Sequence, residues 1–211
     1  DLAITDYVTV DFNAVVECVD LLGGITLDEV TDEEAVLMQG YQDEINKLTK
    51  HDSPYLSSGG TNVTLDGVQA CAYSRIRYTK GDDYKRAERQ RTVLAAMVAK
   101  AQKSDLKTIN KLIDAVFGDI QTSFSNTDLV ALAAQVFNYK LGESSGFPFS
   151  KNTTTLGSKG SVVVPCTLET NVIELHQFLF DDTEYTPSDA VIANSKKIIN
   201  DTGMYESNGY R

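Results

Sequence analysis

The stretch Asp6–Glu34, DYVTVDFNAVVECVDLLGGITLDEVTDEE, contains a strand, a helix and a second strand in succession. Apolar and polar residues alternate in DYVTVDF, which is the period of a strand. The next apolar residues recur at helical spacing until Gly23 and Gly24, and GITLDEV is again strand-like. Thr31 with Glu34 three residues later forms a capping box that begins another helix. This alternation predicts an α/β fold.

The middle of the chain continues the pattern. We expect a short helix over about residues 65–73, an extended segment in YSRIRYT (residues 73–79), and a long helix capped by Asp82 or Asp83. The apolar stripe of that long helix consists of Val93, Leu94, Met97, Val98 and Ala101.

The second half of the chain is mostly helical. A Gly/Ser/Thr-rich passage after Gly142 leads to a strand in SVVVP and then to two final helices. Thr186 is expected to cap the last helix, with Pro187 in its first turn and Gly203 beyond its end. We expect a domain over residues 1–142 and a helical C-terminal extension, 143–211, packed on that domain.

The composition narrows the functional classes. The chain has 211 residues and a formal net charge of -11, which disfavours general attraction to nucleic acid or anionic lipid. No run of about 18 apolar residues is present, so no segment is expected to span a membrane. Three cysteines lie far apart without metal-ligand spacing, and we expect them to be small buried residues.

Cations nevertheless gather in one place. The stretch RIRYTKGDDYKRAERQR, Arg75–Arg91, carries seven Lys or Arg side chains and three acidic ones. If a helix starts near Asp83, then Arg86, Arg89 and Gln90 share one face of its first turns. Basic side chains near a helix N-terminus oppose the helix dipole, so helix stability does not account for their position.

Arg75 and Arg77, two apart on the expected extended segment, point to the same side. If the loop after them folds back, guanidinium groups from both segments surround the positive end of a helix. That arrangement suits an anion with several oxygens, such as a pyrophosphate. A solvated charged face, with local pairing to Asp82, Asp83 and Glu88, is the alternative. Nucleic acid is a third possibility, disfavoured because no groove-reading element or broad basic surface is evident.

These residues resemble the arginine-rich motif of the LytR-CpsA-Psr family of bacterial cell-wall proteins. The motif runs Arg-x-Arg, a few residues, Asp, x-x-Arg, x-x-Arg-Gln, and falls here on Arg75, Arg77, Asp83, Arg86, Arg89 and Gln90. DYVTVDFNAVVECVDLLGGITL is similar to the family's Tyr-Val strand and following helix, and LDGVQACAYSR to its Leu-x-Gly-x-x-Ala-x-x-Tyr-x-Arg. ETNVIELHQFLFDDTEYTPSDAVIANSKKI resembles the C-terminal extension of members from Gram-positive bacteria.

The resemblance implies a central mixed sheet sandwiched between helices, with an apolar tunnel for a polyprenyl chain. It also implies a phosphotransferase, which moves a wall teichoic acid, capsule or similar glycopolymer from a polyprenyl-pyrophosphate carrier to peptidoglycan through a phosphodiester link. The alternatives are polyprenyl-pyrophosphate binding or hydrolysis without transfer, and transcriptional regulation.

Roles for individual residues follow from the same resemblance. The implied catalytic residues are Arg75, Arg77, Asp83 and Arg86. The implied pyrophosphate ligands are Arg75, Arg77, Arg86, Arg89 and Gln90. We favour orientation of an arginine over proton transfer as the role of Asp83. Positions 93, 94, 97 and 98 face either the core or the lipid tunnel, and we favour the core.

The implied partners are a polyprenyl-pyrophosphate-linked glycan, peptidoglycan and a membrane reached through an anchor absent from this sequence, without nucleic acid. The implied location is extracytoplasmic and membrane-anchored. Mg²⁺ is the implied cofactor, and its ligands are expected in a region before Asp1 rather than in this chain. The resemblance places a further arginine and several strands in that region, so we expect this chain alone to be weakly active or inactive.

Overall fold

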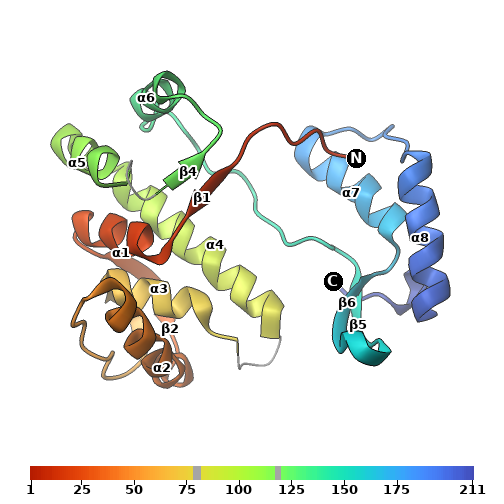
Figure 1. Cartoon of the computed structure of the whole chain (residues 1–211), viewed down its shortest axis with the longest axis horizontal. Coiled ribbons are helices and arrows are strands. Elements are labelled where there is room, and N and C mark those ends of the chain that lie inside the picture. Colours follow the sequence, from red (N-terminus) through yellow and green to blue (C-terminus); the bar gives the residue numbers. More distant parts are fainter. Residues whose placement is uncertain (78–81, 117–119) are drawn as a thin grey trace. The chain divides into compact units, whose positions relative to one another are not determined.

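In the computed structural model the chain folds as two compact units (Figure 1). The large unit is built from Ile4–Glu143, and the small unit from Asp1–Ala3 together with Ser144–Arg211. The predicted boundary after residue 142 and the packing of the extension on the first domain stay predictions.

The structure describes residues 1–77, 82–116 and 120–211, and the side chains of Asp82, Asp83 and Val116 lie outside this description. Within these ranges no helix has both the length and the apolar character needed to cross a membrane.

The large unit contains four strands and six helices among its described residues. They are β1 (Val8–Val10), α1 (Phe12–Leu21), β2 (Ile25–Val30), α2 (Asp32–Thr49), β3 (Gly60–Leu65), α3 (Gly67–Arg75), α4 (Asp82–Ala101), α5 (Leu106–Val116), β4 (Ile120–Thr122) and α6 (Asn126–Ala134). The predicted capping box is confirmed, because the Thr31 hydroxyl accepts from the backbone of Glu34 while the Glu34 carboxylate accepts from the backbone of Thr31. The predicted α/β fold is confirmed.

The arrangement of the strands differs from the expected central mixed sheet. In the part of the chain that the structure describes, the strands pair two by two and antiparallel: β1 with β4, and β2 with β3 in the large unit. The β2 strand buries Ile25, Leu27 and Val30 and exposes the residues between them, so one face of its ladder is covered. The strand predicted in DYVTVDF is confirmed as β1, and all three of its residues are exposed.

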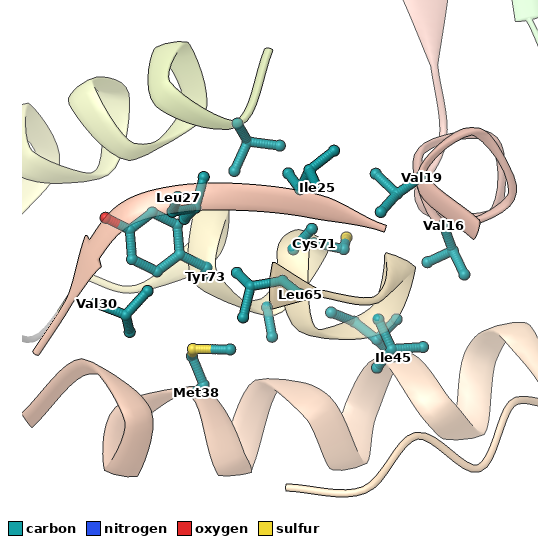
Figure 2. Close-up of a cluster of buried hydrophobic side chains, with 14 of the residues drawn as sticks. Val16, Val19, Ile25, Leu27, Val30, Met38, Ile45, Leu65, Cys71 and Tyr73 are labelled. Atoms are coloured by element: carbon teal, nitrogen blue, oxygen red, sulfur yellow. The ribbon is translucent and has the colours of Figure 1, made fainter. Parts of the chain in front are cut away.

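The core of the large unit surrounds β2 (Figure 2). Figure 2 shows Val19 from α1, Leu27 from β2, Met38 from α2 and Leu65 from β3 within one cluster of buried side chains. Burying an aliphatic side chain of this size contributes about 1.5–3 kcal/mol. This cluster therefore fixes α1, α2 and α3 around the β2–β3 ladder.

The structure corrects the expected backbone around the arginines. Arg75 is the last residue of helix α3 and Ile76 caps that helix, so Arg75 does not lie on an extended segment. Helix α4 already includes Asp82 and Asp83, which places both in its first turn rather than at the N-cap.

The expected stripe of α4 is partly corrected. Val93 is buried in the core and Met97 packs against it, but Leu94 is 59% exposed. One residue turns a helix by about 100°, so Leu94 leaves the face that Val93 presents to the core. The core interpretation therefore holds for Val93 and not for Leu94.

The small unit pairs a hairpin with two helices: β5 (Lys151–Thr155), β6 (Ser161–Pro165), α7 (Leu168–Phe180) and α8 (Asp189–Thr202). The strand predicted in SVVVP is confirmed as β6. The buried Asn171 side chain of α7 accepts from the Ser150 backbone N–H and donates to the Ser150 carbonyl, which ties the helix to the start of the hairpin.

The cap of α8 corrects a further expectation. Ser188, not Thr186, is the N-cap, and Pro187 precedes the helix. The side chain of Asp1 accepts hydrogen bonds from the Ser188 backbone N–H at 2.8 Å, the Ser188 hydroxyl at 2.6 Å and the Tyr185 hydroxyl at 2.7 Å. Gly203 ends the helix with φ of 68°, as expected for a C-terminal glycine.

Candidate functional site

Arg75 lies in a cradle of aromatic rings. Its guanidinium carbon is 4.6 Å from the centroid of the Phe12 ring and 5.2 Å from that of Tyr41. Phe12 begins α1 and Tyr41 lies in the middle of α2, so two helices hold one side chain at the end of a third. Ring faces attract a guanidinium and restrict its rotation, so the direction of the planar fork is fixed.

A carboxylate stands beside this guanidinium. Nη1 of Arg75 is 2.9 Å from Oε2 of Glu44, whose side chain is 53% exposed. Nη1 is also shielded from solvent. Within the described part of the chain, no acceptor has the alignment with Nη1 that a hydrogen bond requires. Glu44 thus forms an ion pair that neutralises the Arg75 guanidinium but is not aligned as a hydrogen bond. The exposure of Glu44 makes this contact exchangeable.

Arg89 is held differently. Only 6% of its side chain is exposed, and its Nε donates to Oε1 of Glu34 at 2.8 Å. Its Nη1 donates to the carbonyl oxygen of Ile76 at 3.2 Å, and its guanidinium lies 5.9 Å from the Tyr73 ring centroid. Burial raises the pKa of the Tyr73 hydroxyl above its usual value, and the Glu34 carboxylate adds to that shift. Arg89 therefore joins α4 to α2 and to the end of α3.

The other predicted residues flank this junction. Arg77 is exposed and follows the cap of α3; Arg86 is half-buried and Gln90 is exposed, both on α4. The backbone of Asp83 is in the first turn of α4, and its side chain lies outside the described residues. The Arg89–Ile76 bond brings the end of α3 against α4, but convergence of Arg77, Arg86 and Gln90 on one ligand stays a prediction.

Sequence reasoning missed the residues that support the arginines. Glu44 and Tyr41 carry no local signal, because the contact with Arg75 depends on how α2 packs on α3. Phe12 is 41% exposed and lies beneath Arg75, a placement that the helical spacing of the apolar residues does not indicate. Glu34 was identified only as a capping residue, although one of its oxygens caps α2 and the other holds Arg89.

A cavity of about 410 Å³ lies elsewhere in the large unit, where β1, β4 and α6 meet. Its lining includes Tyr7, Thr122, Phe124 and Leu129 and contains none of the predicted site residues. We assign it no part in anion binding, because no charged side chain lines it.

The sequence of this chain matches the model of the LytR_cpsA_psr family over residues 1–153. The chain belongs to this family. The predicted membership of the LytR-CpsA-Psr family is therefore confirmed.

Relatives of known name agree with this membership. The chain is 30% identical over 135 residues to the polyisoprenyl-teichoic acid–peptidoglycan teichoic acid transferase TagU of Enterococcus faecalis, covering 63% of this chain and 39% of TagU. It is 29% identical over 162 residues to TagV of Bacillus subtilis, a transferase of the same description, covering 76% of this chain and 36% of TagV. The chain thus spans less than two fifths of the length of either relative.

Solved structures share the fold. The crystal structure of B. subtilis TagV superposes with a TM-score of 0.56 at 21% identity, over 88% of this chain and 66% of TagV. An Enterococcus faecalis structure described as a transcriptional regulator superposes with a TM-score of 0.60 at 17% identity, over 93% of this chain and 66% of the other.

The described residues of this LytR_cpsA_psr member do not assemble a metal centre. Across residues 1–77, 82–116 and 120–211, no group of three or more His, Cys, Asp or Glu side chains is placed to hold an ion. The residues present therefore do not fit a complete Mg²⁺ site, and Mg²⁺ stays a prediction from the resemblance.

The cysteines provide a pH-dependent prediction. Burial raises the pKa of the Cys71 thiol to about 11, and burial with the nearby Glu17 carboxylate raises that of Cys18 to about 11. The folded chain binds these protons more tightly than the unfolded chain, whose thiols titrate near the ordinary value of 9.0. This stabilisation is complete below pH about 9 and is lost as pH rises to about 11.

We therefore expect the free energy of unfolding, measured with urea at fixed pH steps, to fall between pH about 9 and 11. A Cys18→Ala and Cys71→Ala double variant should show a shallower fall over the same window. An equally steep fall in that variant would assign the loss to other groups.

Proposed function

We propose that this chain binds a polyprenyl-pyrophosphate-linked glycopolymer and transfers the glycopolymer to peptidoglycan. TagU and TagV are named as transferases of teichoic acid to peptidoglycan, and common family membership supports the same chemistry here. Because peptidoglycan lies outside the cytoplasm, we propose an extracytoplasmic, membrane-anchored location.

The cradle of Arg75 carries this proposal. Two rings hold the guanidinium, and its Nη1 lacks a directed acceptor within the part of the chain that the structure describes. If Arg75 only stabilised the fold, we would expect its buried Nη1 to donate a hydrogen bond to an acceptor of the chain. Leaving a buried donor without such a bond costs about 1–3 kcal/mol. A phosphate oxygen in place of the Glu44 carboxylate would be an aligned acceptor for this Nη1, which Glu44 contacts at 2.9 Å without hydrogen-bond alignment.

The reaction that fits this site is a displacement at phosphorus. A sugar hydroxyl of peptidoglycan attacks the phosphorus that carries the glycopolymer, and the new oxygen–phosphorus bond forms the phosphodiester. The bond from this phosphorus to the bridging oxygen breaks, polyprenyl phosphate leaves, and the hydroxyl proton passes to solvent or to a carboxylate. Arg75, Arg77 and Arg86 stabilise the charge on the phosphate oxygens. Asp83 orients one of these arginines, and Gln90 binds a phosphate oxygen.

Binding and transfer test the proposal separately. Isothermal titration of the chain with farnesyl pyrophosphate should show saturable binding, and farnesol should bind more weakly because it lacks the anion. Transfer is measured as a glycan–peptidoglycan adduct by mass spectrometry, from a polyprenyl-pyrophosphate-linked glycan. Formation of this adduct would support the proposed transfer. Absence of farnesyl pyrophosphate binding would contradict the proposal.

Two other functions give different results in the same samples. Hydrolysis without transfer releases a glycan phosphate together with the lipid monophosphate and forms no adduct, so the free glycan phosphate distinguishes it from transfer. Transcriptional regulation predicts sequence-specific duplex binding that falls steeply with salt. The E. faecalis structure described as a transcriptional regulator shares only the fold with this chain, and the net charge of -11 disfavours a duplex partner.

The exchangeable position of Glu44 gives a further prediction. Glu44→Gln removes the charge that competes with the ligand for Arg75, so farnesyl pyrophosphate should bind about two- to fivefold more tightly. Glu33→Gln, at an exposed position of the same helix, is the control for the change in net charge. Equal affinity gains in both variants would indicate a long-range charge effect rather than competition at Arg75.

A further inference from the structure

We propose that Glu34 is a positioning residue for Arg77 and acts through Arg89. Glu34 holds Arg89, and Arg89 holds the peptide group that leads into Arg77. This inference rests on the proposed function, because it concerns the geometry of the same pyrophosphate site.

Both oxygens of Glu34 are engaged. Oε2 accepts from the backbone N–H of Thr31 at 2.9 Å and from its hydroxyl at 3.2 Å, and Oε1 accepts from Nε of Arg89 at 2.8 Å. The Glu34 side chain is 13% exposed and that of Arg89 is 6% exposed. Since the capping box fixes Glu34 to the first turn of α2, the carboxylate is a rigid support for Arg89.

Arg89 passes this restraint to α3. Its Nη1 donates to the carbonyl oxygen of Ile76, a residue with no exposed surface whose own N–H bonds to Tyr73. The carbonyl of Ile76 belongs to the peptide group that it shares with Arg77. The plane of that group sets the direction in which the Arg77 side chain leaves the backbone.

The energetics favour a role in position over a role in stability. A buried ion pair contributes little net stability, because desolvation of both charges offsets their attraction. Removing only one partner is strongly destabilising, because it leaves a charge buried without its counter-ion. A pair linking three helices at the predicted site is therefore better explained by the geometry that it imposes than by the stability that it adds.

Glu34→Gln tests this inference with little change to α2. Glutamine at the third helical position still accepts from the Thr31 backbone, so the capping box is kept while the charge facing Arg89 is lost. We expect the affinity for farnesyl pyrophosphate to fall about tenfold. A small misplacement of the Arg77 guanidinium weakens its contacts with the pyrophosphate. Glu33→Gln is the matched control and should bind within about twofold of the unchanged chain.

A double-mutant cycle separates position from general stability. In an Arg77→Ala background, Glu34→Gln should cause no further loss of affinity, because the residue that it positions is gone. A merely structural role would lower affinity by the same factor in both backgrounds. Circular dichroism and the melting temperature establish that each variant is folded during the titrations.

A second variant keeps the test usable if Glu34→Gln does not fold. Glu34→Gln with Arg89→Met leaves no unpaired buried cation, and it also lacks the bond to Ile76. We expect this double variant to lose as much affinity for farnesyl pyrophosphate as Glu34→Gln does. In an Arg77→Ala background, the same two substitutions should cause no further loss.

The outcomes distinguish this inference from the proposed function. If the unchanged chain does not bind farnesyl pyrophosphate, the proposed function fails. If the unchanged chain binds and folded Glu34→Gln binds equally well, or loses affinity regardless of Arg77, the positioning role is overturned while the proposed function stands.

Discussion

Arg75→Ala is expected to weaken binding of farnesyl pyrophosphate about 100-fold. Each charge-assisted hydrogen bond is worth about 1.5–3 kcal/mol, and a guanidinium offers two such bonds to one phosphate. The cradle of Phe12 and Tyr41 adds to the loss, because the rings restrict Arg75 before the ligand arrives. Isothermal titration at fixed ionic strength measures this change, since screening alters the affinity of any cation for a pyrophosphate.

Arg75→Lys separates charge from shape. Lysine keeps the positive charge but presents a single ammonium group in place of the planar fork. We expect an affinity between those of the unchanged chain and Arg75→Ala. If Arg75→Lys bound as tightly as the unchanged chain, the site would recognise charge alone, and the paired geometry of the guanidinium would have no role.

Gly67→Ala is expected to destabilise the large unit by about 3 kcal/mol, which is at the upper end of the usual cost of overpacking. Gly67 opens α3, where its N–H donates to the Asp20 carboxylate at 2.7 Å. A Cβ atom at this position would overlap the carbonyl oxygen of Val16 and come within 2.7 Å of its Cα. Both atoms belong to the backbone of α1, so no side-chain rotation relieves the overlap.

Gly40→Ala provides the control. Gly40 lies in the exposed part of α2, and a Cβ atom there meets nothing within 4 Å. Alanine is a better helix former than glycine by roughly 0.5–1 kcal/mol, so this variant should be slightly more stable than the unchanged chain. Urea denaturation measures both changes. A Gly67→Ala variant as stable as Gly40→Ala would mean that α1 and α3 separate without cost.

Local signals in the sequence predicted much of the fold. The Thr31–Glu34 capping box, the β2 strand and the glycine that ends α8 are each determined by residues within one or two turns, and all three are confirmed. The error at Arg75 has a different origin. Asp66 and Gln69 cap α3, and Val68, Ala70 and Ala72 are buried around it, so tertiary packing continues the helix beyond the expected end.

The sequence predicted candidate site residues but not the residues that support them. The arginine motif pointed to the family, and family membership is confirmed, while the roles of the individual arginines stay predictions. However, Glu34 and Arg89 are separated by 55 positions, and no local periodicity connects them. The packing of α2 against α3 and α4 determines that rings enclose Arg75 and that a carboxylate fixes Arg89.

The attachment of Asp1 to the start of α8 has a consequence for connectivity. Residues 1–3 and 144–211 belong to one unit, so the large unit is, in topological terms, an insertion within a discontinuous domain. The hydrogen bonds that Asp1 accepts join it to Tyr185 and Ser188, which follow it by 184 and 187 positions, so forming them closes a long loop of chain. The entropic cost of that closure grows only slowly with loop length, and the bonds at the start of α8 offset part of it.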